Sequence, residues 1–407
     1  MIERIEFETL LRQLVQIKSP YFHEDEIMEF VHTWFCQRDI PAEIHTFYEE
    51  KETDFHGKNV VGILDSGREG PCIYLGGHLD TVMQCDGWEH PPYAGVVEDE
   101  KMYGIGTLDM KSGCAAIMLA VERFAKNCAA SENFCGKLIY HLVSDEEGPY
   151  GLGTIFIIKD KIHQISEQAD FAIIAEPSAG FTKVAHPCLC LGAKGGYNYT
   201  VKVYGKSAHA ATPELGINAL ADASAIVSEL EKIEPVRDEK LGESALCVIR
   251  MQGGGAACSV PDYAEVEIFQ HTVRGETKTS IEENVRQAIA RANIRSRVEV
   301  TFRKPPVEGF DGGFDAYCID ENDPILAVLT ESAEEVCKKD VNIAYFQSIG
   351  DFNHIGGKLR IPTVLFGPDG KNFHSSEEFA DLRTAVETAN TIEKFLTKVL
   401  LKKAKES

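Results

Sequence analysis

The chain has 407 residues, and its 64 Asp and Glu side chains against 41 Lys and Arg give a formal net charge of −23. This acidic surplus argues against DNA, RNA and anionic membranes as partners, because affinity for phosphate depends on clustered basic side chains. Hydrophobic residues make up 44% of the chain, enough to bury a large core, so disorder is not expected.

Nothing in the sequence indicates export. The N-terminal residues MIERIEFE lack the basic and apolar regions of a secretion signal, and no apolar run approaches the length of about 18 residues that spans a membrane. Twelve cysteines are too dilute for a disulfide scaffold, and most lie in apolar runs. We therefore expect a cytoplasmic protein with free thiols.

The first half of the chain alternates helical and strand-like patterns. Apolar residues at helical spacing predict two N-terminal helices, over residues 7–15 and 27–35, which are separated at Ser19-Pro20. Short apolar runs and one further helical pattern predict these elements: strands at 59–64, 72–76, 138–143 and 171–175, and a helix at 112–126. This order is typical of an α/β domain with helices around a central sheet.

A different order begins near Gly195. The pattern predicts a β-α-β-β-α-β unit, the order of a ferredoxin-like two-layer domain, with elements at 197–204, 217–233, 245–251, 264–273, 281–292 and 297–302. After a Gly-rich connector the alternation of helical and strand-like patterns resumes. It predicts a helix at 324–338, a strand at 363–366, and a terminal helix from about 384 that includes the basic segment 398–405. The sequence thus predicts one α/β domain in two segments, 1–193 and 307–407, interrupted by a smaller domain at 194–306.

Acidic and histidine side chains follow three of the predicted strands. His78 and Asp80 lie two residues apart after the second strand, so on extended chain both side chains point the same way. Glu146 and Glu147 follow the third strand, and Glu176 follows the fourth. Carboxylates that leave buried strands are costly unless a cation or a shared proton receives them. Because ligands of open α/β sheets bind beyond the carboxyl ends of the strands, the pattern favours a metal site.

The segment Gly104-Ile105-Gly106-Thr107-Leu108-Asp109 allows more than one interpretation. Its G-x-G-x-x spacing is that of a dinucleotide-binding loop, but Asp109 at the last position of that fingerprint would repel a pyrophosphate. The glycines instead permit a tight loop that presents Asp109 just before the helix predicted from Ser112. Position alone does not decide between a ligand and a helix N-cap.

Together these motifs resemble the M20 family of metallopeptidases and deacylases, over nearly the whole chain. The matching residues, in chain order, are Gly77-His78-Leu79-Asp80-Thr81-Val82, Trp88, Pro92-Tyr93, Gly95, Asp109-Met110-Lys111, Glu146-Glu147, Glu176-Pro177-Ser178, Ala208-His209, Pro213, Gly216, Asn218-Ala219, Gly350-Asp351, Gly367-Pro368 and His374-Ser375-Ser376-Glu377-Glu378-Phe379. The resemblance implies a two-metal exopeptidase-like catalytic domain with a central mixed sheet, interrupted by a ferredoxin-like βαββαβ lid and dimerisation domain.

The resemblance also implies five metal ligands. His78 and Glu176 would hold one divalent ion, Glu147 and His374 the other, and Asp109 would bridge the two. Two imidazoles with three carboxylates suit Zn²⁺ first, with Mn²⁺ and Co²⁺ as further candidates. His374 has no support from spacing alone and rests on the resemblance.

Three further residues take catalytic roles in the resemblance. Asp80 would orient His78, and Glu146 would be the general base for a water activated by two metal ions. His209 would reach across the interface of a homodimer and donate a hydrogen bond to the oxyanion.

The expected reaction is hydrolysis of a linear amide bond. A small peptide is the leading substrate, with the enzyme acting as a dipeptidase or carboxypeptidase; the close alternative is an N-acyl amino acid, as for an acetylornithine deacetylase or a succinyl-diaminopimelate desuccinylase. A remote alternative is a binding protein on the same fold without catalysis. That alternative predicts a missing ligand or base, and none is missing.

Two departures from the family pattern concern the substrate. Cys258 and His271 stand where family members often have the Asn and the Arg that contact polar groups of the substrate. Loss of an Arg removes a bidentate partner for a carboxylate, so the set of substrates should change. The residues considered for substrate contacts are Lys194, Asn218, Arg250, His271 and Arg274. His90, His186 and His354 match no motif and are expected to have no role in the site.

Overall fold

The computed structural model describes residues 1–402, and the chain divides into two compact units. The first unit contains Met1–Gly192, Cys318–Phe346 and the chain from Gly350 onward. The second unit contains Ala193–Tyr317 and Gln347–Ile349. No helix among residues 1–402 combines the length and the apolar character that crossing a bilayer requires.

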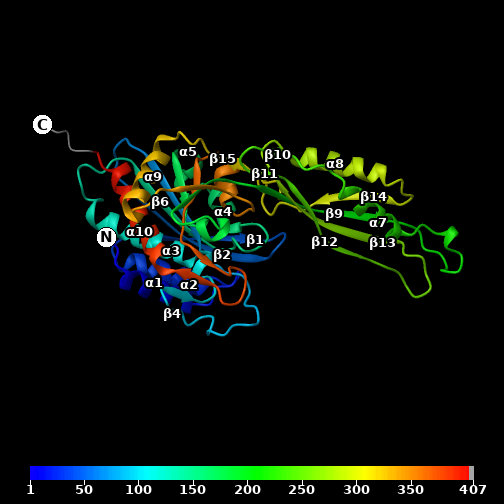
Figure 1. The fold of residues 1–407 in the computed structure, drawn as a ribbon, viewed down its shortest axis with the longest axis horizontal. Helices are drawn as coiled ribbons and strands as arrows, with labels where there is room; N and C mark the ends of the chain where they lie inside the picture. The colour runs from blue at the N-terminus through cyan, green and yellow to red at the C-terminus, as the bar shows by residue number, and fades with distance from the viewer. Residues whose placement is uncertain (403–407) are drawn as a thin grey trace. The chain divides into compact units, whose positions relative to one another are not determined.

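A mixed sheet forms the centre of the first unit (Figure 1). Its strands, in spatial order, are β1 (Glu43–Glu49), β2 (Phe55–Asp65), β6 (Lys137–Val143), β3 (Cys72–His78), β7 (Phe171–Ile174), β17 (Thr363–Leu365), β8 (Cys188–Ala193) and β15 (Tyr317–Cys318), with β16 (Asn342–Phe346) paired to β8. The four central strands β6, β3, β7 and β17 run parallel, and antiparallel strands flank them. The predicted central mixed sheet is therefore confirmed.

Helices and a small second sheet complete the first unit. The helical segments are α1 (Arg4–Gln16), α2 (Asp25–Cys36), η1 (Thr107–Lys111), α3 (Ser112–Asn127), α4 (Leu152–Lys159), η2 (Ile162–Gln164), α5 (Ile165–Gln168), α6 (Ser178–Thr182), α9 (Pro324–Cys337), η4 (His354–Lys358) and α10 (Leu382–Leu400). The small sheet pairs β18 (Gly370–Lys371), β19 (Phe379–Asp381), β5 (Lys101–Tyr103) and β4 (Val96–Glu98) in that order. Helix α10 packs against α3 and α9, and both α1 and α2 bury the apolar stripe that the helical spacing predicted.

The second unit has the predicted β-α-β-β-α-β order. Its elements are β9 (Gly195–Tyr204), η3 (Pro213–Leu215), α7 (Ala219–Leu230), β10 (Arg237–Asp238), β11 (Gly242–Glu243), β12 (Ala245–Gly253), β13 (Tyr263–Thr272), α8 (Lys278–Arg291) and β14 (Arg297–Phe302). The four long strands form an antiparallel sheet in the order β12-β13-β9-β14.

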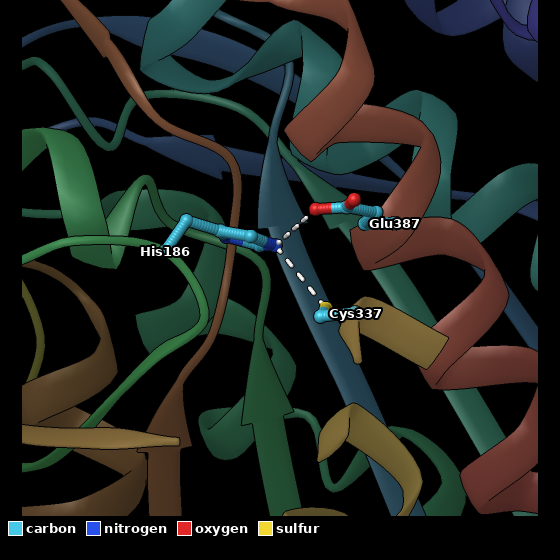
Figure 2. Close-up of side chains that lie close together, drawn as sticks. All are labelled: His186, Cys337 and Glu387. Atoms are coloured by element: carbon cyan, nitrogen blue, oxygen red, sulfur yellow. Dashed lines mark hydrogen bonds and ion pairs between the residues drawn. The ribbon is translucent and has the colours of Figure 1, made fainter. Parts of the chain in front are cut away.

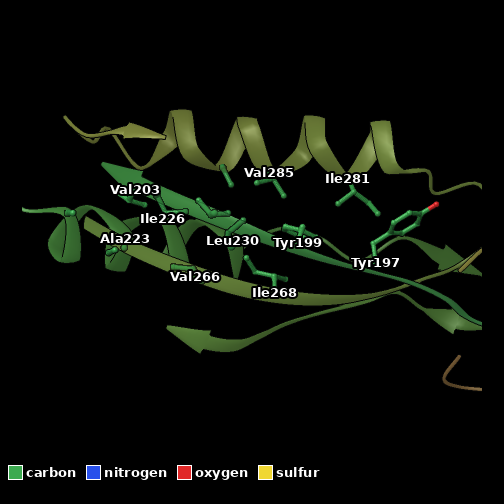
Figure 3. Packing of buried hydrophobic residues seen from close by; sticks show 14 residues of the cluster. Tyr197, Tyr199, Val203, Ala223, Ile226, Leu230, Val266, Ile268, Ile281 and Val285 are labelled. Atoms are coloured by element: carbon green, nitrogen blue, oxygen red, sulfur yellow. The ribbon is translucent and has the colours of Figure 1, made fainter. Parts of the chain in front are cut away.

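Period-two and helical patterns meet in the core of the second unit. Alternate residues of β9 and β13 are buried on one face of the sheet, and one stripe from each helix covers that face (Figure 3). On α7 this stripe begins at Ala219 and ends at Leu230. The helix begins after the predicted residue 217, because the Asn218 side chain accepts a hydrogen bond from Ala221 N and caps it, and it ends at Leu230 instead of the predicted 233.

Several elements differ from the sequence prediction. Strand β1 was not predicted, because this edge strand carries polar side chains such as His45 and Thr46. Strand β8 was not predicted, because its apolar run is short and follows Pro187 directly. The basic segment 398–405 was predicted to continue the terminal helix; α10 ends at Leu400, and residues 403–405 lie outside the described part of the chain.

Gly113 allows the start of α3 to approach the end of β7. A Cβ at this position would lie 2.0 Å from the backbone oxygen of Ala175, the residue before Glu176. Such a contact is possible only if the helix or the strand end moves. The missing side chain therefore lets α3 support the strand end that carries Glu176.

We expect Gly113→Ala to destabilise the protein by about 1–3 kcal/mol or more, because the added methyl group overpacks against backbone atoms that cannot rotate away. Urea unfolding measures this change. Gly255→Ala is the control, since its Cβ would meet no atom closer than 3.6 Å. Equal stability of the two variants would contradict the close-approach argument.

Candidate metal centre

The carboxyl ends of three parallel strands meet at one edge of the central sheet. In register, His78 at the end of β3 lies opposite Val143 at the end of β6. On the other side of β3, Gly76 pairs with Ile174 at the end of β7. The segments that continue from these strands carry Glu146, Glu147 and Glu176, as the sequence predicted for ligands of an open α/β sheet.

His78 faces carboxylates with one ring nitrogen and is held by the other. Its Nε2 lies 3.3 Å from Asp109 Oδ1 and 3.6 Å from Glu176 Oε1. On the opposite side of the ring, Nδ1 lies 3.1 Å from the backbone oxygen of Asp80 and 3.4 Å from its Oδ1. A ring held in this way by its Nδ1–H presents the Nε2 lone pair to a cation.

His374 forms a second group with the same bridging carboxylate. Its Nε2 lies 2.9 Å from Glu147 Oε1 and 3.2 Å from Asp109 Oδ2. The two oxygens of Asp109 therefore face two different histidines: Oδ1 faces His78 and Oδ2 faces His374. This division distinguishes Asp109 from an N-cap, and the N-cap of α3 is in fact Lys111.

Glu378 positions the loop that carries Asp109. Its Oε1 accepts hydrogen bonds from the backbone N–H groups of Leu108 and Asp109, and its Oε2 accepts one from Gly106. Burial raises the pKa of Glu378 to about 8, and the backbone donors act against this rise. No role for Glu378 was predicted from the sequence, because its partners are backbone N–H groups that leave no sequence pattern.

Asp80 fixes the segment that follows β6. One carboxylate oxygen accepts from Glu146 N at 3.1 Å, and the other from Glu147 N at 2.8 Å. Besides its contacts with the His78 ring, Asp80 therefore sets the direction in which both glutamates leave the backbone.

Glu146 lies beside the two groups without occupying either position between His and Asp109. Its Oε1 accepts from Asp351 N at 3.1 Å, and its Oε2 lies 3.8 Å from His78 Nε2. Asp351, another residue without a predicted role, is held by a hydrogen bond from the Thr154 hydroxyl. One oxygen of Glu146 is thus fixed by the backbone, and the other faces the histidine.

The carboxylates at this edge do not ionise alike. Burial raises the pKa of Glu146 and of Glu176 well above the usual range, and it raises the pKa of Glu147 to about 7. Burial acts in the same direction on Asp109, but hydrogen bonds from His374 and His78 outweigh it and lower its pKa to about 2. The pKa of His374 rises to about 11 because its ring donates to Asp109 and Glu147. The carboxylates can therefore be ionised together only when positive charge lies nearby.

The donor set fits a pair of divalent cations. Each histidine provides one nitrogen together with a non-bridging glutamate oxygen and one oxygen of Asp109. Glu176 Oε2 is buried and has no hydrogen-bond partner among the described residues, which is the condition of a ligand atom rather than of a structural hydrogen bond. Mixed imidazole and carboxylate ligands suit Zn²⁺ and neighbouring transition metals.

The other predicted site residues belong to the second unit. His209 is exposed, and its Nδ1 accepts from Ala211 N. Asn218 caps α7, and exposed Arg250 pairs with Glu267 at 3.2 Å. His271 Nε2 lies 3.2 Å from Ser348 Oγ, and burial lowers the pKa of its ring. These contacts are consistent with local structural roles.

Comparison with known proteins assigns the family. The family model of peptidase family M20/M25/M40 matches residues 74–398. The chain belongs to the M20/M25/M40 peptidase family. The resemblance drawn from the motifs is thereby confirmed, and the match includes every residue of the metal centre described above.

Relatives of this family member have several activities. A succinyl-diaminopimelate desuccinylase from Acinetobacter baumannii is 36% identical over 166 residues, which are 40% of this chain and 42% of the relative. The similarity thus spans less than half the length of this curated relative. Among solved structures, a tripeptidase from Staphylococcus aureus aligns with a TM-score of 0.76 at 21% identity, over 98% of this chain and 99% of that chain. A dinuclear metal-binding M20 peptidase from Bacillus subtilis aligns with a TM-score of 0.70 at 15% identity, over 98% of both chains.

We expect Asp80→Asn to weaken metal binding about 10–100-fold, because the amide has only one acceptor oxygen for the two backbone N–H groups of Glu146 and Glu147, and the His78 ring loses part of its support. Zn²⁺ titration of metal-free protein measures the affinity. Asp86→Asn, at an exposed position of the same loop, is the control. An unchanged affinity of Asp80→Asn would show that the contacts of Asp80 do not shape the site.

Metal binding should release protons near neutral pH. With a pKa of about 11, His374 is protonated in the metal-free state, and with a pKa of about 7 Glu147 is partly so. Ligand atoms must lose these protons, so the apparent affinity should rise with pH between about 6 and 8. Calorimetric titration in two buffers of different ionisation enthalpy counts the released protons, and a count of zero would contradict this account.

Proposed function

We propose that the protein hydrolyses the amide bond of small peptides by means of a water activated at two divalent metal ions. The observation that carries this proposal is the division of the two Asp109 oxygens between His78 and His374, with Glu146 beside both groups. Bound metal ions would polarise the scissile carbonyl and acidify the attacking water. Zn²⁺ is the first candidate, with Mn²⁺ and Co²⁺ next.

Glu146 is proposed as the general base. Its pKa is raised by burial, which suits a group that must take a proton from water and give it to the leaving nitrogen. The hydrogen bond from Asp351 N holds one oxygen of the carboxylate, so the other can accept and return the proton. His78, Asp109, Glu147, Glu176 and His374 are proposed to hold the two ions, and Asp80 to keep His78 and the glutamate segment in place.

A pocket next to His374 supports a small substrate. It has a volume of about 570 Å³ and includes Phe373 and Gly180 together with two lysines, Lys183 and Lys371, and one aspartate, Asp369. The volume is within the usual range for a small-molecule site. We propose that part of the substrate beside the scissile bond binds here.

The second candidate function is removal of an acyl group from an N-acyl amino acid. The similarity to a desuccinylase favours it, and Lys183 and Lys371 would suit the free carboxylate of a succinyl group. A binding protein without catalysis remains the remote alternative, but a general base would then have no use.

We further propose that the inserted domain at 194–306 is a lid and a dimerisation domain. Strand β12 is an edge strand of its sheet, and two large apolar side chains on it, Ile249 and Met251, are 52% and 41% exposed. An edge of this kind favours pairing with a second copy. Exposed His209 is proposed as the oxyanion donor supplied by the partner copy, while Asn218, Arg250 and His271 remain candidates for substrate contacts.

A panel of dipeptides, longer peptides and N-acyl amino acids, assayed with and without added metal, separates the two functions. We expect metal-dependent turnover of dipeptides or of C-terminal residues to be the faster. Faster turnover of N-succinyl or N-acetyl amino acids would establish the deacylase instead. Turnover of neither class by metal-loaded protein would exclude both.

Glu146→Gln should lower kcat about 10²–10⁴-fold while both metal ions stay bound, because the amide cannot accept the proton of the water. Metal analysis and kinetics on the same sample test this. Glu147→Gln is the matched comparison, since loss of a ligand should lower metal content as well. Normal turnover of Glu146→Gln would refute the role of general base.

If His209 acts across an interface, His209→Ala should remain a dimer and lose most of its activity. Sedimentation and turnover measurements on one preparation give both readouts. A fully active dimeric His209→Ala variant would remove His209 from the mechanism without affecting the assignment of the metal ligands.

A further inference from the structure

A second group of metal-type ligands lies in the first unit and shares no residue with the centre described above. It consists of His186, Cys337 and Glu387, which come from the segment before β8, the last residue of α9, and α10 (Figure 2). His186 Nε2 faces both other side chains, at 3.7 Å from Cys337 Sγ and 3.5 Å from Glu387 Oε2. Their ligand atoms all lie within 4.8 Å of one another.

The two distances from His186 Nε2 are close to those between ligands around one zinc ion. With Zn–S near 2.3 Å and Zn–N and Zn–O near 2.0–2.1 Å, a tetrahedral site places N and S about 3.6 Å apart and N and O about 3.3 Å apart. The observed distances of 3.7 Å and 3.5 Å differ from these by only 0.1–0.2 Å.

The histidine has unused hydrogen-bonding capacity. His186 is only 5% exposed, and its separation of 3.5 Å from Glu387 is longer than a normal hydrogen bond. Among the described residues the buried Nδ1 has no partner of normal hydrogen-bond geometry. Against the effect of burial, which lowers the pKa of the ring, an interaction with the backbone of Gly367 acts to raise it. A buried imidazole left this way is costly unless something else binds it.

Charge and ligand type define the cation. A thiolate and a carboxylate around a neutral imidazole carry two negative charges, of which Arg383 offsets one, so the cluster keeps a net negative charge that favours a cation. Arg383 donates to both oxygens of Glu387 at 3.2 Å and can hold this carboxylate in place from the side of α10. Sulfur in the donor set favours Zn²⁺ or Co²⁺ over Mg²⁺ or Ca²⁺.

The same three side chains do not suit nucleophilic catalysis. Cys337 is 6% exposed, so a substrate carbonyl could not reach its sulfur without rearrangement of the two helices. The ligands instead join three segments that are 151 and 50 residues apart in sequence, so a metal ion bound to them would cross-link these parts of the fold.

We propose that His186, Cys337 and Glu387 bind one zinc ion that joins the segment before β8 to helices α9 and α10. The fourth position would be filled by water, as at zinc sites with three protein ligands. This site does not depend on the proposed function, because none of its ligands contributes to the catalytic centre.

Cobalt distinguishes this site from the catalytic centre by its spectrum. Only the proposed site contains sulfur, so titration of metal-free protein with Co²⁺ should produce a near-ultraviolet thiolate-to-cobalt charge-transfer band with a stoichiometry of about one per chain. Cys337→Ser should lose this band and keep the visible bands of cobalt bound through nitrogen and oxygen. Cys135→Ser, which removes another buried thiol, is the matched control and should keep all bands.

The proposal is overturned if the unmodified protein shows no such band, or if Cys337→Ser retains it. The first result needs no variant and so does not depend on whether Cys337→Ser folds. In the zinc form, Cys337→Ser should hold one equivalent less than Cys135→Ser, and Glu387→Gln should bind this equivalent at least about tenfold more weakly. Equal zinc content and affinity in all three variants would show that the cluster is only a packing contact.

Discussion

Repulsion between buried carboxylates is the constraint on which the candidate metal centre depends. Asp109, Glu146, Glu147 and Glu176 gather where strands of one sheet end, in a place where burial alone would keep most of them protonated. In the metal-free protein the histidines supply the compensating charge, and they favour the ionised form of Asp109. Two divalent ions would take over this role, so the charge that makes the site unfavourable to assemble also makes it selective for cations.

Such a site requires a backbone that does not relax. Asp80 and Glu378 each use a carboxylate to bind successive backbone N–H groups, and they fix the two segments that carry Glu147 and Asp109. Gly113 brings α3 against the strand end before Glu176. These contacts leave the side chains little freedom to move apart. Folding of the surrounding layers, and not metal binding, therefore brings the carboxylates together against their electrostatic repulsion.

The regular parts of this fold and the strand-end acids could be predicted from sequence, because both follow local periodicity. Strands β3 and β6 are short apolar runs. His78 and Glu146 lie at or just after the ends of these strands, so the sequence indicates both residues directly. His374 has no such signal, since its approach to Asp109 depends on how the last third of the chain packs. The same holds for Asp351, which acts through its backbone N–H, and for Glu378, whose partners are backbone groups that no sequence pattern reveals.

The cluster of His186, Cys337 and Glu387 likewise could not be predicted from the sequence. A histidine without a motif, a cysteine at a helix end and a glutamate on an amphipathic helix each have an ordinary explanation when considered singly. What changes the interpretation is that one buried nitrogen, Nε2, faces both other ligands at distances suited to zinc, while its 3.5 Å separation from Glu387 is longer than a normal hydrogen bond. Ligands brought together only by tertiary packing leave no spacing to search for, so a site of this kind has to be found from unsatisfied groups in the structure.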